Sequence, residues 1–257
     1  MTEVYKFDEV KHAHFINGKR VPGVTTISGS IDDGKSGALM GWAAKLTAAY
    51  VVDNLVMKDG AVFVGGMELT PDTAGKVLGV AKKAYKESRD AAGDLGTRVH
   101  TLCEKYWTED ELLIQQDEAP AFATWKEWVE DYSVEAVSTE QHIYSLKNLY
   151  GGILDLIATL NGVRYLVDIK TSNRISPGYF IQLGGYLLAY EEMTGEKIEN
   201  AGIIRLDKAG EGYEWCDLSG DLEETRSDFL GALRIYNNLK KYRKTINKAV
   251  KKERVDA

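Results

Sequence analysis

Apolar positions in the first half of the chain recur mostly with the spacing of a helix. Leu39, Trp42 and Leu46, for example, lie three or four positions apart, which places them on one helical face. Further along, Gly93 and Gly96 interrupt the same kind of pattern, because glycine disfavours the interior of a helix. Four helices are therefore predicted, over residues 37–56, 73–91, 97–107 and 119–132.

The N-terminal segment has the pattern of strands. Asn17-Gly18 is a favoured two-residue hairpin turn, and residues 24–27 (VTTI) are rich in β-branched side chains. Residues 5–28 are therefore expected to form a short hairpin followed by a strand. Together with the four helices, this makes residues 1–133 a mainly helical region with an N-terminal hairpin.

The second half of the chain alternates between strand and helix patterns. Asn161-Gly162 is another hairpin turn, and the apolar stretches on either side of it predict paired strands. The expected elements are strands over 136–145, 152–160, 163–171, 201–206 and 213–218, a helix over 177–194, and a long helix from about residue 221. There is no internal repeat and no linker. One domain over 1–257 is predicted, with a sheet core at 134–220 and a C-terminal helix at 221–257.

Composition narrows the class of protein. The 257 residues are 44% hydrophobic and 28% charged with 4 prolines, which excludes a disordered or collagen-like chain. No apolar run approaches the roughly 20 residues of a membrane span, and the charged N-terminus lacks the apolar stretch of a signal peptide. We therefore expect a soluble, cytoplasmic protein of a bacterial or phage-infected cell. The two cysteines, Cys103 and Cys216, form no CxxC pair, so they exclude a four-cysteine zinc or iron–sulfur site and are interpreted as core thiols.

Charge is unevenly distributed along the chain. The formal net charge is −7, whereas residues 240–254 contain eight Lys or Arg and one Glu, a local charge of +7. A mostly acidic body with a basic C-terminal helix can contact phosphates locally. The net charge alone therefore leaves binding to nucleic acid open.

The residues with the clearest chemistry lie between positions 150 and 172. Asp155 lies in GILDLIA, and Asp168 and Lys170 follow in YLVDIKTS. The hairpin turn would set these strands side by side, so the two carboxylates can approach each other, and buried carboxylates are costly unless they bind a cation. Asp168 and Lys170 are two positions apart and face the same side of a strand. Two carboxylates, Mg²⁺ and an ammonium suit phosphodiester hydrolysis, since the metal neutralises the phosphate and lowers the pKa of water while the lysine orients that water.

In order and spacing, this set of segments closely resembles the PD-(D/E)XK nuclease superfamily, in the RecB-like exonuclease branch that includes phage and mitochondrial-maintenance members. The similar segments are residues 24–27 (opening strand), 96–100 with Glu104 (GTRVH, helical histidine motif), 150–155 (YGGILD, GxxD motif), 168–172 (DIKTS, (D/E)xK motif), and Gln182 with Tyr186 (QxxxY helix). They extend over much of the chain. Leu154 stands where the superfamily has a proline before its first acid.

The resemblance implies a role for each matching residue. Asp155 and Asp168 would bind Mg²⁺ or Mn²⁺, together with the Ile169 carbonyl and His100. Lys170 would position or activate the attacking water. Gln182 and Tyr186 would contact the phosphate or steady the lysine. Iron–sulfur relatives in this branch use four cysteines, so that cofactor is excluded here.

Two glutamates and several basic or aromatic residues are further candidates. Glu140 could join the metal site or be a solvated surface acid, and Glu104 could join it or pair with Arg98 or Lys105. Backbone contacts with DNA are expected from residues 240–254, Lys82, Lys83, Lys86 and Arg98, and base stacking from Trp42 or Tyr85.

A competing motif lies earlier in the chain. Residues 29–36 (GSIDDGKS) satisfy the phosphate-binding pattern GxxxxGK[ST], and Asp168 could then serve as the Mg²⁺-binding acid of a nucleotide hydrolase. Asp32 and Asp33 would, however, place two negative charges against a polyphosphate, which such a loop binds through converging N–H groups. We therefore treat a P-loop nucleotide hydrolase that depends on Lys35 as the alternative.

The sequence thus predicts an α/β fold, with a restriction-endonuclease-like core (a mixed central sheet flanked by helices) and an N-terminal helical region. The expected function is metal-dependent hydrolysis of DNA, as an exonuclease that processes ends in recombination, repair or phage replication. A non-cleaving DNA-binding subunit with the same fold is a second alternative. The expected partner is DNA, single- or double-stranded, with no membrane and with room for a homo-oligomer or a recombination protein.

Overall fold

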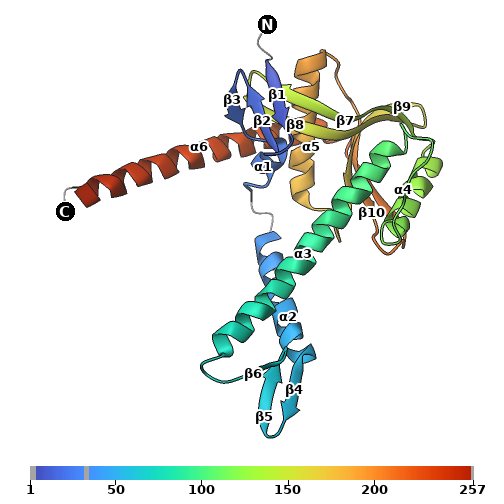
Figure 1. Ribbon diagram of the computed structural model, residues 1–257. Coiled ribbons are helices and arrows are strands. Elements are labelled where there is room, and N and C mark those ends of the chain that lie inside the picture. The colour runs from blue at the N-terminus through green and yellow to red at the C-terminus, as the bar shows by residue number, and fades with distance from the viewer. Residues whose placement is uncertain (1–3, 32–34, 256–257) are drawn as a thin grey trace. The chain divides into compact units, whose positions relative to one another are not determined.

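The computed structural model describes residues 4–31 and 35–255 and packs as two compact units (Figure 1). One, called here the sheet unit, comprises Met1–Ile31 and Val99–Ala257. The other, the inserted unit, comprises Asp32–Arg98. The sequence predicts one domain over 1–257, because nothing in its composition marks the two places where the inserted unit begins and ends.

The sheet unit is built on a mixed sheet. Its elements are β1 (Tyr5–Asp8), β2 (Ala13–Ile16), β3 (Lys19–Val21), α1 (Val24–Ser28), the C-terminal part of α3 (Ala74–Lys105), α4 (Ala119–Asp131), β7 (Glu135–Ser145), β8 (Tyr150–Leu160), β9 (Val163–Lys170), α5 (Pro177–Thr194), β10 (Ala201–Leu206), β11 (Tyr213–Asp217) and α6 (Leu222–Val255). Within the described residues, the larger sheet has five strands in the order β11-β10-β9-β8-β7. The β9–β10 pair is parallel and the other pairs are antiparallel. The predicted α/β class and its mixed sheet are therefore confirmed.

The turn that joins β8 and β9 explains why these strands are neighbours. Asn161 and Gly162 both have positive φ, 49° and 80°, as a two-residue hairpin turn requires. The β8–β9 ladder then continues from Leu160–Val163 to Leu156–Val167. The turn predicted from two letters of sequence therefore sets the register of the two strands that carry Asp155 and Asp168.

Helices cover both faces of this sheet. Gly202 and Ile203 are adjacent in β10, so their positions face opposite sides of the sheet. Ile203 lies in the core that includes Leu183 and Leu187 of α5, whereas a Cβ on Gly202 would meet the ring of Trp215, which itself packs against Trp128 of α4. Asp168 pairs with Ile203 in the parallel ladder and therefore faces α5. The sheet thus presents Asp168 to the helix that carries Gln182 and Tyr186.

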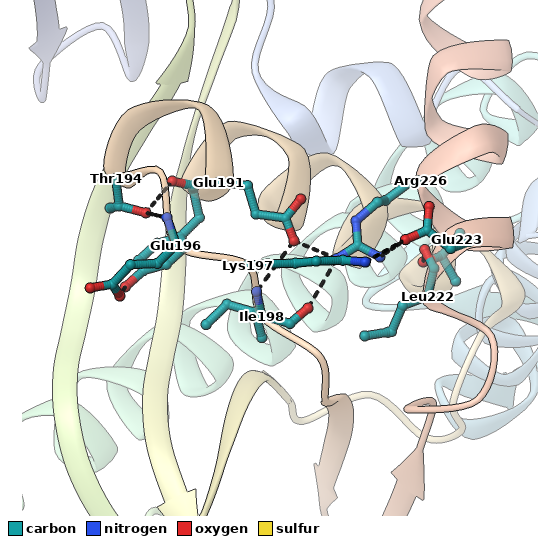
Figure 2. Close-up of polar contacts among 10 residues, drawn as sticks. Glu191, Thr194, Glu196, Lys197, Ile198, Leu222, Glu223 and Arg226 are labelled. Carbon is teal, nitrogen blue, oxygen red and sulfur yellow. Dashed lines mark hydrogen bonds and ion pairs between the residues drawn. The ribbon is translucent and has the colours of Figure 1, made fainter.

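A buried arginine joins the end of α5 to the start of α6 (Figure 2). Arg226 is an ion-pair partner of Glu191 and donates to the Ile198 carbonyl at 3.0 Å and to Glu223 at 3.2 Å. The side chain of Arg226 is 7% exposed and that of Glu223 is 76% exposed. The buried contacts therefore hold the two helices together, because an exposed ion pair adds little.

The segment preceding the competing motif is a helix, and the strand predicted over residues 24–27 is wrong. Gly23 accepts backbone hydrogen bonds from Thr26 and Ile27 at 3.0 and 3.1 Å, which begins a helical turn. Val24 and Ile27, three positions apart, are buried against the core of α5 and α6. Burial of this helical pair outweighs the β propensity of the VTTI letters.

The inserted unit contains α2 (Lys35–Asp53), a small sheet of β4 (Leu55–Lys58), β5 (Ala61–Val64) and β6 (Met67–Glu68), and most of α3. The sheet was not predicted, although Asp59-Gly60 and Gly65-Gly66 are turn signals; Asp59 and all three glycines have positive φ. Region 1–133 is therefore less helical than expected.

The break predicted at Gly93 and Gly96 is also wrong, because α3 is continuous from Ala74 to Lys105. Each glycine costs a helix about 1 kcal/mol, which weakens a helix without ending it. The buried side chains of Val99, Leu102 and Cys103 anchor its C-terminal turns in the sheet unit. None of the helices in the described part of the chain is both long and apolar enough to cross a membrane.

Candidate active site

Two carboxylates lie opposite each other on neighbouring strands. Gln141 of β7 pairs with Leu154 of β8, and the next residues along this register are Glu140 and Asp155. Like charges directly opposite each other destabilise a sheet. A cation that both groups could bind would remove this repulsion.

A third carboxylate extends the row onto β9. Leu156 pairs with Val167, and the ladder ends there; the next residues on this register are Asp155 and Asp168. Instead of a ladder bond, the Ile169 N–H donates to Asp155 Oδ2 at 2.7 Å. Strands β7, β8 and β9 therefore bring Glu140, Asp155 and Asp168 into one row.

Asp155 lies in the middle of this row and is nearly buried, with 13% of its side chain exposed. Its Oδ2 is 3.9 Å from Nδ1 of His100. Burial raises the pKa of Asp155, although the charge of Lys170 and the Ile169 N–H act in the opposite direction. This carboxylate therefore lacks the solvation that would stabilise its negative charge.

Asp168 is fully buried and contacted on both oxygens. Its Oδ1 accepts from Gln182 Nε2 at 3.1 Å, and its Oδ2 is 2.6 Å from Lys170 Nζ. Burial, reinforced by Asp155, raises the pKa of Asp168 to about 6, even though the Lys170 ammonium opposes the shift. Lys170 is therefore the charge partner of Asp168.

Helix α5 supplies the groups that hold Asp168. Gln182 Nε2 also donates to the hydroxyl of Tyr186 at 2.7 Å, as two residues four apart on one helical face can. Gly152 leaves room for this helix, since a Cβ there would lie 3.0 Å from the Tyr186 ring. The QxxxY spacing thus places both side chains next to the sheet.

Lys170 is held on three sides. Besides Asp168, its ammonium contacts the Ile169 carbonyl at 3.2 Å and lies 5.1 Å from the centre of the Tyr179 ring. Burial lowers the pKa of Lys170, but Asp168 and Asp155 together outweigh burial and leave the pKa above its usual value. The lysine is therefore a charged donor. Tyr179 was not among the predicted residues; its place three positions before Gln182 on α5 was the available signal.

His100 approaches the row from α3. Burial, together with the positive charge of Lys170, lowers its pKa to about 4, so the imidazole is neutral at neutral pH. One donor atom each of His100, Glu140 and Asp155 lies within 4.8 Å of the other two. A neutral imidazole and two carboxylates are ligands that divalent metals use.

Glu140 has an unusual backbone conformation and a carboxyl group with a raised pKa. Its φ is 45°, a conformation that non-glycine residues rarely adopt inside a strand. Burial, Asp155 and Glu104 raise its pKa to about 7. Glu104 therefore acts on Glu140 through its charge; among the described residues, the three-membered donor group does not include Glu104. Of the two open candidates, Glu140 is the one that lies among the other donors.

The predicted DNA-contacting residues lie elsewhere. Lys82, Lys83 and Lys86 are exposed on the inserted unit, and Trp42 packs edge-on against Tyr85 with ring centres 5.3 Å apart. Residues 240–248 are exposed along α6. Of the two thiols, Cys103 is buried and Cys216 is half-buried.

The side chains of the row fit a divalent cation. Burial raises the pKa of Asp155, and burial together with the charge of Asp155 raises that of Glu140; a cation bound between the two carboxylates would lower both pKa values. His100 is already in the neutral form that a metal requires. Asp168 differs, because one oxygen is already paired with Lys170. The donors best placed to share one ion are therefore His100, Glu140 and Asp155.

Comparisons with known proteins add little. No family model matches the sequence, and no curated protein is similar to it. Among solved structures, the chain is similar to the one titled "Crystal structure of SSO0001", with 14% identity and a TM-score of 0.26. The likeness covers 44% of this chain and 57% of that one, so it spans little more than half the length of the solved protein. At this TM-score the likeness carries no argument about fold or function.

Proposed function

We propose that this chain is a metal-dependent deoxyribonuclease of the PD-(D/E)XK type, with a restriction-endonuclease-like core. The observation that carries the proposal is the convergence of Asp155, Asp168 and Lys170 on β8 and β9, with Gln182 from α5 bonded to Asp168. The same residues resemble the nuclease motifs in sequence. Their side-chain contacts supply a physical reason for that spacing.

His100, Glu140 and Asp155 would hold the metal, with Asp168 and the Ile169 carbonyl beside them. When bound, Mg²⁺ or Mn²⁺ supplies positive charge at the scissile phosphate and a water of lowered pKa. Lys170 is an ammonium donor at the edge of this group, placed to orient water or to stabilise negative charge on a phosphate oxygen. Gln182 and Tyr186 keep Asp168 in place for that lysine.

The polynucleotide is proposed to be DNA, and the reaction the trimming of DNA ends in recombination, repair or phage replication. Basic residues on α6 support an anionic polymer as substrate, since exposed lysines and arginines recognise phosphates. A catalytic lysine retained beside its acid favours cleavage over the non-cleaving DNA-binding alternative.

The P-loop alternative is weaker than the sequence suggested. Such a loop follows a buried strand, whereas Gly29 follows the helix α1. Residues 32–34 of the motif lie outside the described residues. The alternative still makes a distinct prediction, namely nucleotide hydrolysis that needs Lys35 and not Lys170.

The decisive experiment compares wild-type protein with Lys170→Ala on end-labelled linear and circular DNA, single- and double-stranded, with Mg²⁺, Mn²⁺ or EDTA. We expect loss of label from linear DNA, abolished by EDTA and reduced at least about 100-fold by Lys170→Ala. Lys147→Ala removes an exposed lysine at the β7–β8 turn and should leave the rate unchanged. Nicking of circles would keep the site and change the role to endonuclease.

Two outcomes would contradict the proposal. Equal cleavage by wild type and Lys170→Ala would remove Lys170 from the mechanism. No cleavage of any substrate, together with ATP hydrolysis that Lys35→Ala abolishes, would support the P-loop nucleotide hydrolase instead. Circular dichroism of each variant separates lost chemistry from lost folding.

A further inference from the structure

A polar recess lies in the sheet unit, formed by residues other than the carboxylate row. Its volume is about 350 Å³, and β2, β3, α1 and the middle of α6 contribute its walls. These elements lie side by side in Figure 1. The recess is large enough to receive a small anionic group with its water.

The walls carry positive charge and no negative charge. Arg20 from β3 and Lys240 from α6 both line the recess, and none of its described lining residues is an acid. Neither cation has an ion-pair partner among the described residues. Lys240 begins the basic segment 240–254, and Arg20 adds a second cation to the recess from β3.

One wall is a buried histidine with a fixed orientation. His14 is 7% exposed, and its Nδ1 lies 2.8 Å from the hydroxyl of Tyr5. Burial raises the pKa of Tyr5 to about 12, so its phenol keeps its proton and can donate to Nδ1. Burial lowers the pKa of His14 to about 4, so its imidazole is neutral, and with Tyr5 as the donor to Nδ1 the ring carries its proton on Nε2.

Two glycines leave room for the His14 ring. A Cβ on Gly151 would lie 2.9 Å from the His14 ring, and one on Gly23 would lie 3.2 Å from Nε2. Gly23 and Gly151 also form a parallel bridge. A larger residue at either position would displace His14. The position of the His14 ring in the wall therefore depends on both glycines.

Hydroxyl groups complete the set of donors. Thr25 and Thr26 of α1 are exposed at the recess, and Tyr236 of α6 lies one helical turn before Lys240. Two cations, one N–H and three hydroxyls suit an anion with several oxygens. A phosphate group matches this combination.

The recess is connected to the candidate active site through β8. Gly151, which contacts His14 in the wall, is the second residue of this strand, and Asp155 follows four residues later, a rise of about 13 Å. We propose that the recess binds a phosphate group of the polynucleotide whose backbone reaches the carboxylate row. This rests on the proposed function for the identity of the polymer, whereas the phosphate chemistry rests on the recess alone.

The test measures binding without cleavage. Arg20→Gln with Lys240→Gln is introduced into Lys170→Ala protein, and binding of fluorescent single- and double-stranded oligonucleotides is followed by anisotropy in EDTA, over a series of salt concentrations. We expect affinity to fall about tenfold or more and the slope of log K against log salt to decrease by up to about 1, because the contact with one phosphate is lost. Lys126→Gln with Lys147→Gln removes the same charge from exposed positions and should change affinity less than about twofold.

Parallel titrations with inorganic phosphate and AMP identify the source of the phosphate. Equal DNA affinity in the recess variant and the control variant would overturn the proposal. So would loss of inorganic phosphate binding with DNA affinity unchanged, which would indicate a site for a free anion. Loss of DNA binding in the recess variant of a protein whose wild type never cuts DNA would support the recess and refute the nuclease.

Discussion

At the scale of single residues, the candidate site contains more buried carboxylates than positive groups that could neutralise them. Asp168 has Lys170 and Gln182 as partners, and its pKa still rises to about 6. Glu140 has no such partner in the row, sits at a positive φ, and faces Asp155. Strained backbone and like charges persist where another function compensates for them, and metal binding would do so here.

Glu140→Gln should weaken binding of Mg²⁺ or Mn²⁺ about 10- to 100-fold, because it replaces one of the two donor carboxylates with a neutral amide. Titration calorimetry of the Lys170→Ala protein measures this without turnover. Glu104→Gln is the matched control, since Glu104 lies outside the donor group, and its effect should be small. Equal affinities in the two variants would exclude Glu140 from the metal site.

Stability without metal should depend on pH in a defined direction. The folded-state pKa values of Asp168 and Glu140 are raised, to about 6 and about 7, so the folded protein binds these protons more tightly than the unfolded chain. The stability from this source is complete below pH 4 and is lost as pH rises through 6 and 7. Between pH 4 and 6.5 the lowered pKa values of His100 and His14, both about 4, act in the opposite direction, so Glu140 is tested by difference. In EDTA, the Tm of wild type minus that of Glu140→Gln should fall as pH rises to 7, and saturating Mg²⁺ should flatten this fall. A difference in Tm between wild type and Glu140→Gln that stays constant or rises with pH would contradict the raised pKa of Glu140.

At the scale of elements, pairing across strands assembles the site more than any one element does. The β8–β9 turn aligns Asp155 with Asp168, and α5 then lays Gln182 against Asp168. Helix α3 brings His100 to the same place because its last turns are buried. Continuity of α3 is therefore an element-level property that can be tested directly.

Gly93→Ala should stabilise the protein by about 0.5–1 kcal/mol, because Gly93 lies inside a continuous helix with open space around its Cβ position. Gly60→Ala is the matched control: its Cβ position is equally open, but its φ is +80°, so alanine should destabilise. Urea unfolding compares the two. Destabilisation by Gly93→Ala would show that the helix breaks there after all.

At the scale of the whole molecule, charge is separated along the chain. The residues outside 240–254 carry −14, obtained by subtracting the local +7 from the total of −7. Lysines of α6 such as Lys241, Lys244 and Lys248 are exposed. In the proposed nuclease, an acidic body with one basic helix would direct the phosphate backbone to that helix.

Replacing Lys241, Lys244 and Lys248 with Gln should lower DNA affinity to a similar extent for all sequences. The salt dependence should decrease by up to about one unit per lost contact, because each lysine that pairs with a phosphate releases a counterion. Anisotropy at several salt concentrations measures both quantities. An unchanged slope would mean that α6 does not contact DNA beyond Lys240.

The sequence by itself determined the elements whose signals are local. The helix at 177–194, the hairpin at Asn161-Gly162 and the five strands of the larger sheet follow from turn residues and periodicity within short windows. The two-residue turn also allowed Asp155 and Asp168 to approach each other, and the spacing of two placed Asp168 and Lys170 on one side of a strand; the structure brings all three together.

Only the tertiary structure decided the rest. Burial of Val24 and Ile27 stabilises α1 as a helix although its residues are β-branched. Burial of the C-terminal turns of α3 stabilises that helix although it contains Gly93 and Gly96. Glu140 joins the row through the β7–β8 register, and no two-residue turn in the sequence predicts that register. Such features depend on contacts between residues far apart in sequence, and the energy of those contacts exceeds the local preferences, of about 1 kcal/mol or less, that a sequence window reports.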